Sequence, residues 1–402
     1  MFRLLPPVAT PLPVSTWLAA PLAGPGARQQ FQSQFAQWLP APACFVASSG
    51  RTALFLTLTA LAADRPARRE VVMPAYTCPS LAKVALEAGL RPRLVDIDPH
   101  TLAMDRTGLS DALGERTLAL IWVHPFGIPQ PLGSVLERVH GQGAALIEDA
   151  AQSMGAAYDG RRVGAHGDFG LFSLGPGKPI SAGGGGIVSA NTAAGAALLA
   201  AAWRRLPAPS LAASWLAWLR LTAFTAAFQP SGWWLASRLG AHKVGDQETS
   251  WGFRRSALTA SQAAVAQAQL ARLDTINGQR RRQAAALAER LQRFDFVAPV
   301  QASEPAPAAG AVEPIYLRYP LVAASEPTRD RLVQRLQAVG IGAGRMYRRT
   351  LAEFFPELDG VPHPGAQQVA RRLLTLPTHH HLHTRDLDRI AAAFAHEASA
   401  LG

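Results

Sequence analysis

The sequence predicts an α/β protein with a mostly parallel central sheet flanked by helices, followed by a smaller α+β domain. Between residues 43 and 190, short apolar or β-branched runs end in glycine, proline or polar residues, and helical patterns separate several of them. We therefore divide the chain into a large domain, 1–250, and a small carboxyl-terminal domain, 251–402. The runs that we interpret as strands of the large domain are ACFVA, EVVMPAY, RLVDID, LALIWVH, AALIED, FGLFSL and GGIVSA.

The small domain begins with a long helical pattern. From Ser256 to Phe294 apolar residues recur at intervals of three and four, and Gly278 marks a possible break in that pattern. The remaining elements that we expect are the strand IYLRYPLVA and the helices TRDRLVQRLQAVG, GAQQVARRLLTL and TRDLDRIAAAFAHEA.

Composition points to a folded protein of a reducing compartment. The 402 residues are 49% hydrophobic and 17% charged, which allows a large core and two domains. The two cysteines, Cys44 and Cys78, do not support a disulfide framework or a cysteine-ligated cluster, so we expect a cytoplasmic protein. Prolines interrupt the apolar amino terminus, which makes it a poor signal peptide, and no run reaches the roughly 18 residues of a membrane span.

The chain carries a formal net charge of +11, which predicts attraction to phosphates, nucleic acid or anionic lipid without choosing among them. A solvated basic surface is the alternative. No signature of a nucleic-acid-binding module occurs, and we expect no nucleic acid as a partner.

Residues 200–250 form a tryptophan-rich insert. Six of the nine tryptophans lie between Trp203 and Trp251, and no Asp or Glu occurs from Phe169 to Gly245. This composition fits peripheral membrane contact through residues 206–240. It also fits a pair of helices at a subunit interface, the interpretation that we prefer at this point.

Three groups follow predicted strands and should meet at one edge of the sheet. Asp149 ends AALIED, where a buried carboxylate needs a cation beside it. Ser49 and Gly50 begin a helix, whose free N–H groups attract a phosphate. Lys178 follows FGLFSL by a short glycine-rich turn. A phosphate seat, an acid and an amine together suit pyridoxal 5′-phosphate, whose aldehyde reacts with lysine.

The order of motifs is specific. SSGRTAL, MPAYTCPS, VDIDPHT, VHPFG and EDAAQSMGAAYDGRRVGAHGDFGLFSLGPGK, followed by a glycine run, resembles the DegT/DnrJ/StrS family of fold-type I pyridoxal-phosphate enzymes. These are mostly aminotransferases that act on nucleotide-linked keto sugars. The resemblance implies a homodimer and an amino acid donor such as glutamate, and a role in surface polysaccharide or related biosynthesis.

The resemblance also implies roles for single residues. Lys178 would hold the cofactor covalently and move protons, and Asp149 would pair with the pyridine nitrogen. The other positions that it assigns are Gln152 at the ring hydroxyl, Ser173 with Gly50 and Arg51 at the phosphate, and His124 and Tyr76 lining the pocket.

The chain departs from the family pattern at several places. Arg51 replaces a Thr or Ser, and Gly184 replaces an acid. Cys78 replaces an aromatic residue that usually covers the cofactor, and Tyr76 could cover it instead. The partner-chain asparagine that often reaches the phosphate has no match, and Arg254 or Arg255 could supply a cation instead. These changes keep two alternatives open: a non-sugar substrate or an aldolase-like reaction, and a membrane-surface protein on this fold.

A histidine-rich loop near the carboxyl terminus is the remaining candidate. It holds His379, His380, His381 and His383. Adjacent histidines in a loop rarely point at one centre, so we predict no metal site.

Overall fold

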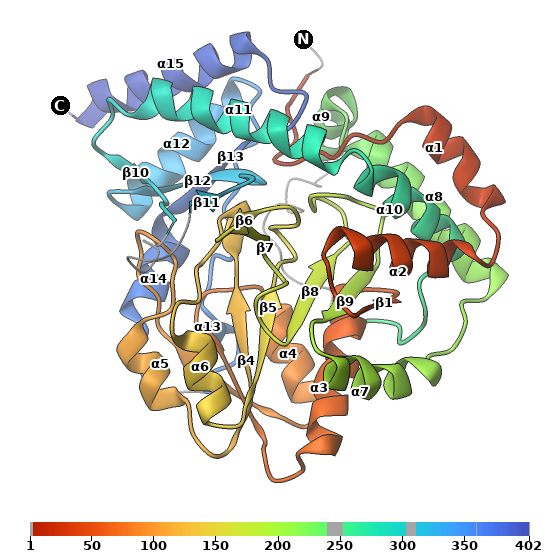
Figure 1. The fold of residues 1–402 in the computed structure, drawn as a ribbon. Coiled ribbons are helices and arrows are strands. Elements are labelled where there is room, and N and C mark those ends of the chain that lie inside the picture. The colour runs from red at the N-terminus through yellow and green to blue at the C-terminus, as the bar shows by residue number, and fades with distance from the viewer. Residues whose placement is uncertain (1–2, 239–251, 303–310, 359, 402) are drawn as a thin grey trace.

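A computed structural model describes residues 3–238, 252–302, 311–358 and 360–401 (Figure 1). Its main feature is a seven-stranded sheet in the order β1-β9-β8-β5-β4-β2-β3. The strands are β1 (Ala43–Ala47), β2 (Glu70–Pro74), β3 (Arg91–Val95), β4 (Thr117–Val123), β5 (Ala145–Asp149), β8 (Phe169–Ser173) and β9 (Gly186–Ala190). Each overlaps one of the seven predicted runs, although β3 begins and ends earlier than the run RLVDID, and the predicted fold class is confirmed.

The sheet is parallel except at one strand. β3, β2, β4, β5 and β8 pair in parallel, whereas β9 runs antiparallel to both β8 and β1. The segment between β8 and β9 contains no crossover helix, and a parallel connection would need one. The carboxyl ends of the parallel strands therefore lie along one edge, with the segment 174–185 beside them.

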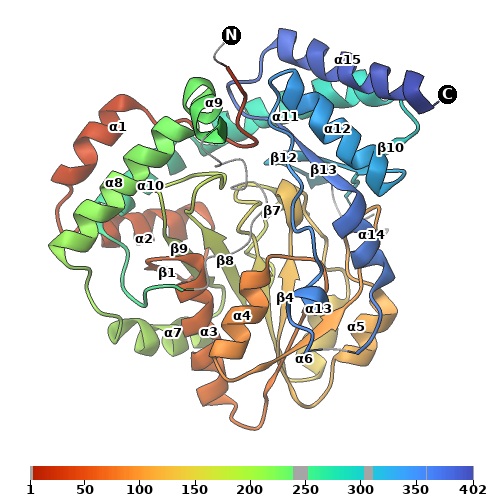
Figure 2. The ribbon, with the colours of Figure 1, turned by 180° about the vertical axis from the view of Figure 1, so that it is seen from behind.

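Helices cover both faces of the sheet. α3 (Gly50–Asp64) and α4 (Pro79–Glu87) lie on one face, and α5 (Arg106–Ala112) and α6 (Val135–Gly141) on the other, as Figures 1 and 2 show together. β5 is buried along its whole length, which explains its unbroken apolar run ALI before the acids. The sheet and its helices form the largest core cluster. The next helix along the chain is α7 (Ala193–Arg204).

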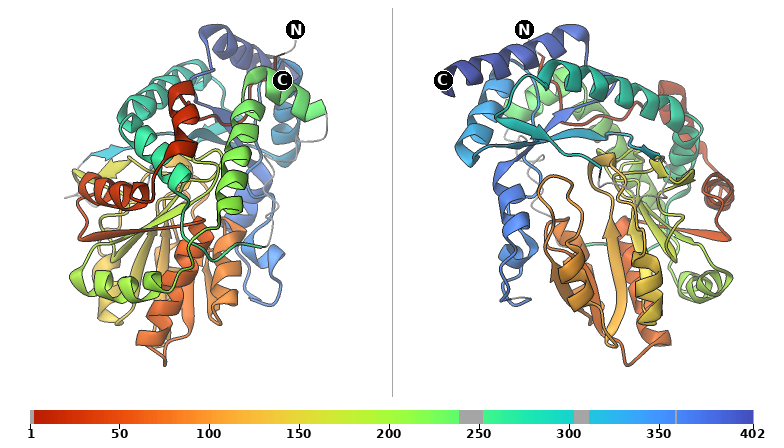
Figure 3. Two further views of the ribbon diagram at one scale, coloured as in Figure 1. Left: turned by 90° about the vertical axis from the view of Figure 1, so that its right-hand side faces the viewer. Right: turned by 60° about the vertical axis from the view of Figure 1, so that its left-hand side comes forward.

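A second, three-stranded antiparallel sheet lies above the carboxyl edge of the first (Figure 3). It consists of β10 (Val297–Pro299), β12 (Arg318–Ala323) and β13 (Leu373–Pro377). A separate core cluster joins it to the helices α11 (Leu273–Leu291), α12 (Glu326–Ala338) and α15 (Thr384–Leu401). Shorter elements complete this half of the chain: β11 (Val312–Glu313), which pairs with β6 (Ala157–Tyr158), then α13 (Leu351–Phe354) and α14 (Pro364–Arg372).

Two predictions about the second half were wrong in detail. The run GAQQVARRLLTL is not one helix, because α14 ends at Arg372 and Leu373–Pro377 pairs with β12 as β13. The break in the long helical pattern falls after α10 (Ala260–Leu270), at Ala271 and Arg272, and α11 passes through Gly278 without interruption.

The predicted boundary between residues 250 and 251 lies outside the described residues. α10, which follows it, packs against α2 (Ala27–Trp38) in a core cluster beside the large sheet. The first part of the chain after that boundary therefore packs with the larger layer, and the division into domains at this point stays a prediction.

The amino-terminal segment connects the two layers. Arg3 pairs with Asp386 at 2.6 Å, and Leu5 donates its backbone N–H to the carbonyl of Gly340 at 2.9 Å. Further along, Thr10 Oγ1 donates to the carbonyl of Lys178 at 2.8 Å. Residues 3–10 thus run from the helices α12 and α15 to the loop that carries the predicted catalytic lysine.

The side chain of His379 also binds this amino-terminal segment. Its Nε2 donates to the carbonyl of Pro6 at 2.8 Å, while Nδ1 accepts from the N–H of His381. The ring is 3% exposed, and burial lowers its pKa to about 3. Among the described residues, no group of three or more His, Cys, Asp or Glu side chains is arranged to hold a metal ion.

A pH-dependent loss of stability follows from this buried ring. Because the pKa of His379 is lower in the folded state, the unfolded chain binds the extra proton below about pH 6.5, and stability falls with pH down to about 3. We expect His379→Gln, which retains the donor to Pro6, to reduce the loss of unfolding free energy between pH 6.5 and 4.5 by about 2–3 kcal/mol. Denaturant unfolding of both proteins at a series of pH values measures this. An identical pH dependence would contradict it.

Candidate active site

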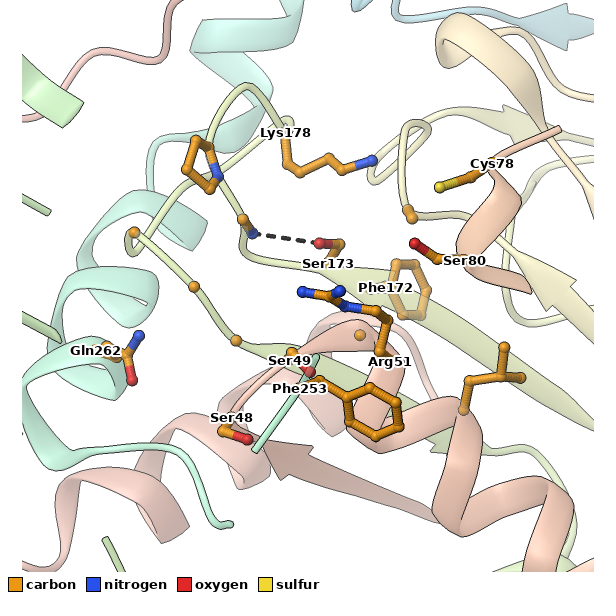
Figure 4. Close-up of a pocket in the computed structure, with 18 of the residues that line it drawn as sticks. Ser48, Ser49, Arg51, Cys78, Ser80, Phe172, Ser173, Lys178, Phe253 and Gln262 are labelled. Atoms are coloured by element: carbon orange, nitrogen blue, oxygen red, sulfur yellow. Dashed lines mark hydrogen bonds between the residues drawn. The ribbon is translucent and has the colours of Figure 1, made fainter. Parts of the chain in front are cut away.

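A cavity of about 1170 Å³ opens at the carboxyl edge of the large sheet. It lies where β4, β5 and β8 end, as ligand sites in such sheets do. The structure brings eight predicted residues together in its lining: Ser49, Gly50, Arg51, His124, Asp149, Gln152, Ser173 and Lys178 (Figure 4 labels several).

Lys178 lies in the glycine-rich loop between β8 and β9, and its side chain extends across the cavity towards Cys78 (Figure 4). Gly177, just before it, has φ +72°, and a Cβ there would lie 2.5 Å from the side chain of Val8. Only glycine allows both the turn and the close approach of the amino-terminal segment. Burial lowers the pKa of Lys178, against the opposing influence of Cys78 and Asp149. The amine therefore gives up its proton more easily than a surface lysine.

Asp149 is the last residue of β5 and is 7% exposed. Its Oδ1 accepts from the N–H of Ala151 at 2.9 Å. Burial raises the pKa of Asp149, and this bond and the charge of Lys178 only partly oppose the rise. A cation in the cavity would restore the ionised form. A protonated pyridine nitrogen is such a cation.

Glu148, the residue before Asp149, has a structural role. Its carboxylate accepts from the N–H groups of Gly164, His166 and Gly167 and from His124 Nε2. Burial alone would raise its pKa, but His124, His166 and the Gly167 amide hold it below the ordinary value. The two adjacent acids therefore serve different purposes, because successive strand residues point to opposite faces.

The amino terminus of α3 forms an anion site. Ser49 caps the helix, since its Oγ accepts from the N–H of Thr52 at 3.1 Å. A Cβ at Gly186 would lie 2.4 Å from Gly50, so glycine is needed where β9 passes this helix end. Ser173 lies beside Gly50, and the guanidinium of Arg51 points from the helix into the cavity (Figure 4). Backbone amides, a hydroxyl and a cation together suit a phosphate.

Gln152 and His124 also line the cavity as predicted, and their polar atoms already form hydrogen bonds within the protein. Gln152 Nε2 donates to the hydroxyl of Tyr347 at 3.0 Å, and its Oε1 accepts from the N–H of Phe126. His124 Nδ1 accepts from the N–H of Gln130, so Nε2 carries the proton that it shares with Glu148. His124 can therefore present only its ring surface to a ligand.

The structure does not bring Tyr76 or Arg255 into the cavity lining. The Tyr76 hydroxyl donates to the carbonyl of Met346, and its ring lies edge-on to Tyr347, which occupies the cavity wall in its place. The guanidinium of Arg255 lies 3.8 Å from the ring centre of Phe55 and 3.8 Å from Glu87, and is half exposed. The spacing of residues in these two loops does not indicate which side chains point into the cavity, so Tyr76 and Arg255 are wrongly predicted as lining residues.

Sequence reasoning missed several residues that do line the cavity. Pro7 and Val8 come from the amino terminus, and Arg318 and Tyr347 come from the second half of the chain. One signal was available: Arg318 is the only charged residue in the predicted strand IYLRYPLVA. Tyr347 has φ +45°, an unusual backbone conformation that is often found at functional sites.

The tryptophan-rich insert forms one wall of the cavity. Its described part contains α8 (Leu211–Ala227) and α9 (Pro230–Arg238). Along α8, Ala213, Leu216, Ala217, Arg220 and Phe224 recur at helical spacing and line the cavity. No single described helix is long and apolar enough to cross a membrane; α8 and α9 reach that length only together, with a bend of 95° between them.

Comparison with known proteins identifies the family. The model of the DegT/DnrJ/EryC1/StrS aminotransferase family matches residues 21–395. The chain belongs to this family. Pyridoxal phosphate is the cofactor of such enzymes, and the amine, the acid and the anion site described above fit it.

Individual curated proteins match only part of the chain in sequence. A UDP-N-acetyl-3-dehydro-alpha-D-glucosamine 3-aminotransferase of Acidithiobacillus ferrooxidans is 38% identical over 35% of this chain and 38% of its own length. A GDP-perosamine synthase of Caulobacter vibrioides is 33% identical over 40% of this chain and 43% of its own length. The chain thus spans about two fifths of the length of these curated relatives.

A solved structure matches over almost the whole chain. The sugar aminotransferase CalS13 of Micromonospora echinospora has a TM-score of 0.74 and 26% identity, with 98% of this chain and 99% of that chain covered.

Proposed function

We propose that this protein is a pyridoxal-phosphate-dependent aminotransferase that moves an amino group from an amino acid, glutamate in the first instance, to a keto group of a nucleotide-linked sugar. The observation that carries the proposal is the convergence of Lys178, Asp149 and the amino terminus of α3 on one cavity. Lys178 and Asp149 are the proposed catalytic residues.

Each of these groups has a defined task in an amino transfer. Bound pyridoxal phosphate supplies an electron-withdrawing ring next to the carbon that bears the amino group. Asp149 would keep the ring nitrogen protonated, and Gly50, Arg51 and Ser173 would hold the phosphate. The Lys178 amine, whose pKa burial lowers, takes a proton from the α-carbon of the donor and returns one at the acceptor carbon.

The size and the charge of the cavity support a nucleotide-linked substrate. Its volume of about 1170 Å³ exceeds the roughly 300–1,000 Å³ of ordinary small-molecule sites, which leaves room for a second large ligand beside the cofactor. Arg220 and Arg254 line it as well and could face a diphosphate. The sugar nucleotides in the names of the two curated relatives have this chemistry, and we place the enzyme in polysaccharide or related biosynthesis in the cytoplasm.

A two-stage spectroscopic screen tests the proposal. The holoenzyme is treated with glutamate, which should convert the bound cofactor to its amino form, and is then mixed with UDP-, GDP- and dTDP-linked keto sugars and with simple ketones. Return of the original absorbance identifies the acceptor. An unchanged spectrum with every amino acid would overturn the transaminase assignment, and release of a carbonyl fragment would favour the aldolase-like alternative.

We also propose that two copies of the chain form the active enzyme. The support for this is the family membership, which implies a homodimer. Sedimentation of the holoenzyme at several concentrations tests it, and a monomer at working concentration would contradict it.

Peripheral contact with an anionic membrane is the further part of the proposal. The ring of Trp17 stacks on the ring of Trp218, with 5.4 Å between the ring centres. This contact joins α1 (Val14–Ala19) to α8. Most of the large apolar side chains that the structure describes as exposed belong to this neighbourhood, namely Val14, Leu18, Leu22, Leu211, Trp215, Leu216, Leu219 and Leu235. No acidic residue lies between 169 and 245, so anionic lipid would meet no repulsion from this stretch of the chain.

Vesicle flotation tests whether the partner of this surface is a membrane or a second subunit. We expect the holoenzyme to float with phosphatidylglycerol vesicles and to float much less after Trp215→Ser with Leu219→Ser, whereas Val361→Ser, at an exposed apolar residue elsewhere, has no effect. A change in sedimentation without a change in flotation would instead assign the surface to the subunit interface.

A further inference from the structure

Arg318 reaches the active site from the second sheet. It is the first residue of β12, where alternate side chains point to opposite faces. Tyr319, Leu321 and Ala323 pack in the core of the second sheet, while Val322 packs in the core of the large sheet. Arg318 shares the face of Val322, and it lines the same cavity as Lys178, Asp149 and Gln152.

The guanidinium of Arg318 is buried without a counter-ion. The residue is 6% exposed, and Nη1 is buried with no hydrogen-bond partner. Among the described residues no carboxylate lies in salt-bridge range of it. Two other described arginines of this half are nearly buried. Arg329 pairs with Glu326 and Asp330, and Arg280 donates to Asn277 Oδ1 and to the carbonyl of Pro179. Burial lowers the pKa of Arg318 to about 10, so the group remains a cation at neutral pH.

An unpaired buried cation destabilises the protein that contains it. The fold nevertheless makes room for this one, since a Cβ at Gly344 would lie 3.0 Å from Nη1. An anionic ligand that arrives in the cavity would supply the missing charge and hydrogen bonds. Arginine is suited to a planar carboxylate, which it binds through two parallel N–H···O bonds.

The position of Arg318 narrows the choice of anion. The cofactor phosphate has its own site at Gly50, Ser173 and Arg51, on the α3 side. Arg318 instead acts on Lys178, whose pKa its charge helps to lower after the larger effect of burial, and on Tyr347, which bonds Gln152. It is therefore close to the amine that must meet the α-carbon of the amino donor.

We propose that Arg318 binds the α-carboxylate of the amino donor and so restricts the first half of the reaction to amino acids. The proposal rests on the proposed function for the identity of the reaction, but not on the identity of the sugar acceptor. It assigns the donor site to the second sheet and the cofactor phosphate site to the large sheet.

The test compares Arg318→Met, Arg318→Lys and Arg51→Met as holoenzymes. Calorimetric titration with glutarate, an inert dicarboxylate, should show binding on the order of 100-fold weaker in Arg318→Met, with partial recovery in Arg318→Lys. Arg51→Met should instead weaken retention of pyridoxal phosphate and leave glutarate binding to the reloaded enzyme within a few-fold of the wild type.

Two more measurements separate ligand binding from a structural role. With L-glutamate, KM for the first half-reaction should rise on the order of 100-fold in Arg318→Met, while 1-phenylethylamine, which has no carboxylate, should react as it does with the wild type. The melting temperature should stay the same or rise, because an unpaired buried charge is removed.

The results that would overturn the inference are distinct from those that bear on the acceptor. Wild-type affinity of Arg318→Met for glutarate, a lowered melting temperature with unchanged KM, or a wild-type holoenzyme that binds neither glutarate nor any amino acid would each refute it. Conversion by glutamate with no sugar acceptor found would contradict only the proposed sugar substrate.

Discussion

Lys178→Ala is expected to lower turnover by at least about 10⁴-fold, because it removes both the covalent hold on the cofactor and the base that moves the proton. The side chain lies in the cavity, and no other lysine among the described residues lines it. Turnover of glutamate with an acceptor, together with the absorbance of the cofactor after dialysis, measures both effects. We expect the cofactor to be lost on dialysis more readily than from the wild type.

Lys83→Ala provides the matched control for this substitution. Lys83 lies on the outer part of α4, beside Glu87, and its removal should leave turnover within about two-fold of the wild type. Added methylamine should restore part of the activity of Lys178→Ala if the missing group is a base. Turnover of Lys178→Ala near the wild-type rate would show that another group moves the proton.

Asp149→Asn should lower the rate of the first half-reaction on the order of 10²–10³-fold, because it keeps the shape and one hydrogen bond but removes the charge that holds the ring nitrogen protonated. Burial already raises the pKa of this carboxyl, so its ionised form depends on the positive ring nitrogen. Stopped-flow absorbance after mixing with glutamate measures the rate, and the dissociation constant of pyridoxal phosphate should rise in parallel.

Asp98→Asn controls for the loss of an acid outside the cavity. Asp98 accepts from the N–H groups of His100 and Thr101 in a surface turn. Its substitution should affect stability slightly and leave the half-reaction unchanged. Equal rates for Asp149→Asn and the wild type would remove Asp149 from the mechanism.

The part of the site that the sequence predicted correctly lies on one sheet. Asp149, Ser173 and the loop with Lys178 follow strands of a single parallel array, and topology alone sends the ends of such strands to a common edge. Gly50 follows β1, which lies next to β9 at the same edge. Local pattern and one rule of sheet geometry were therefore sufficient for these residues.

The residues that sequence reasoning missed depend on how distant segments meet. Arg318 and Tyr347 reach the cavity only because the second sheet lies over the edge of the first, which no short-range pattern encodes. The sequence pattern wrongly predicts a helix at Leu373–Leu376 for a related reason. A short apolar run fits either period, and its pairing with β12 decides the structure.

The path of residues 3–10 has a practical consequence for handling the protein. At one end this stretch is bonded to Asp386 of α15 and to Gly340, which follows α12, and at the other it contacts the turn around Gly177. Removing it would remove the contacts that Val8 and Thr10 make with the loop that carries Lys178. Attachments for rate and binding studies are better placed after α15, whose far end lies at the periphery of the molecule (Figure 1).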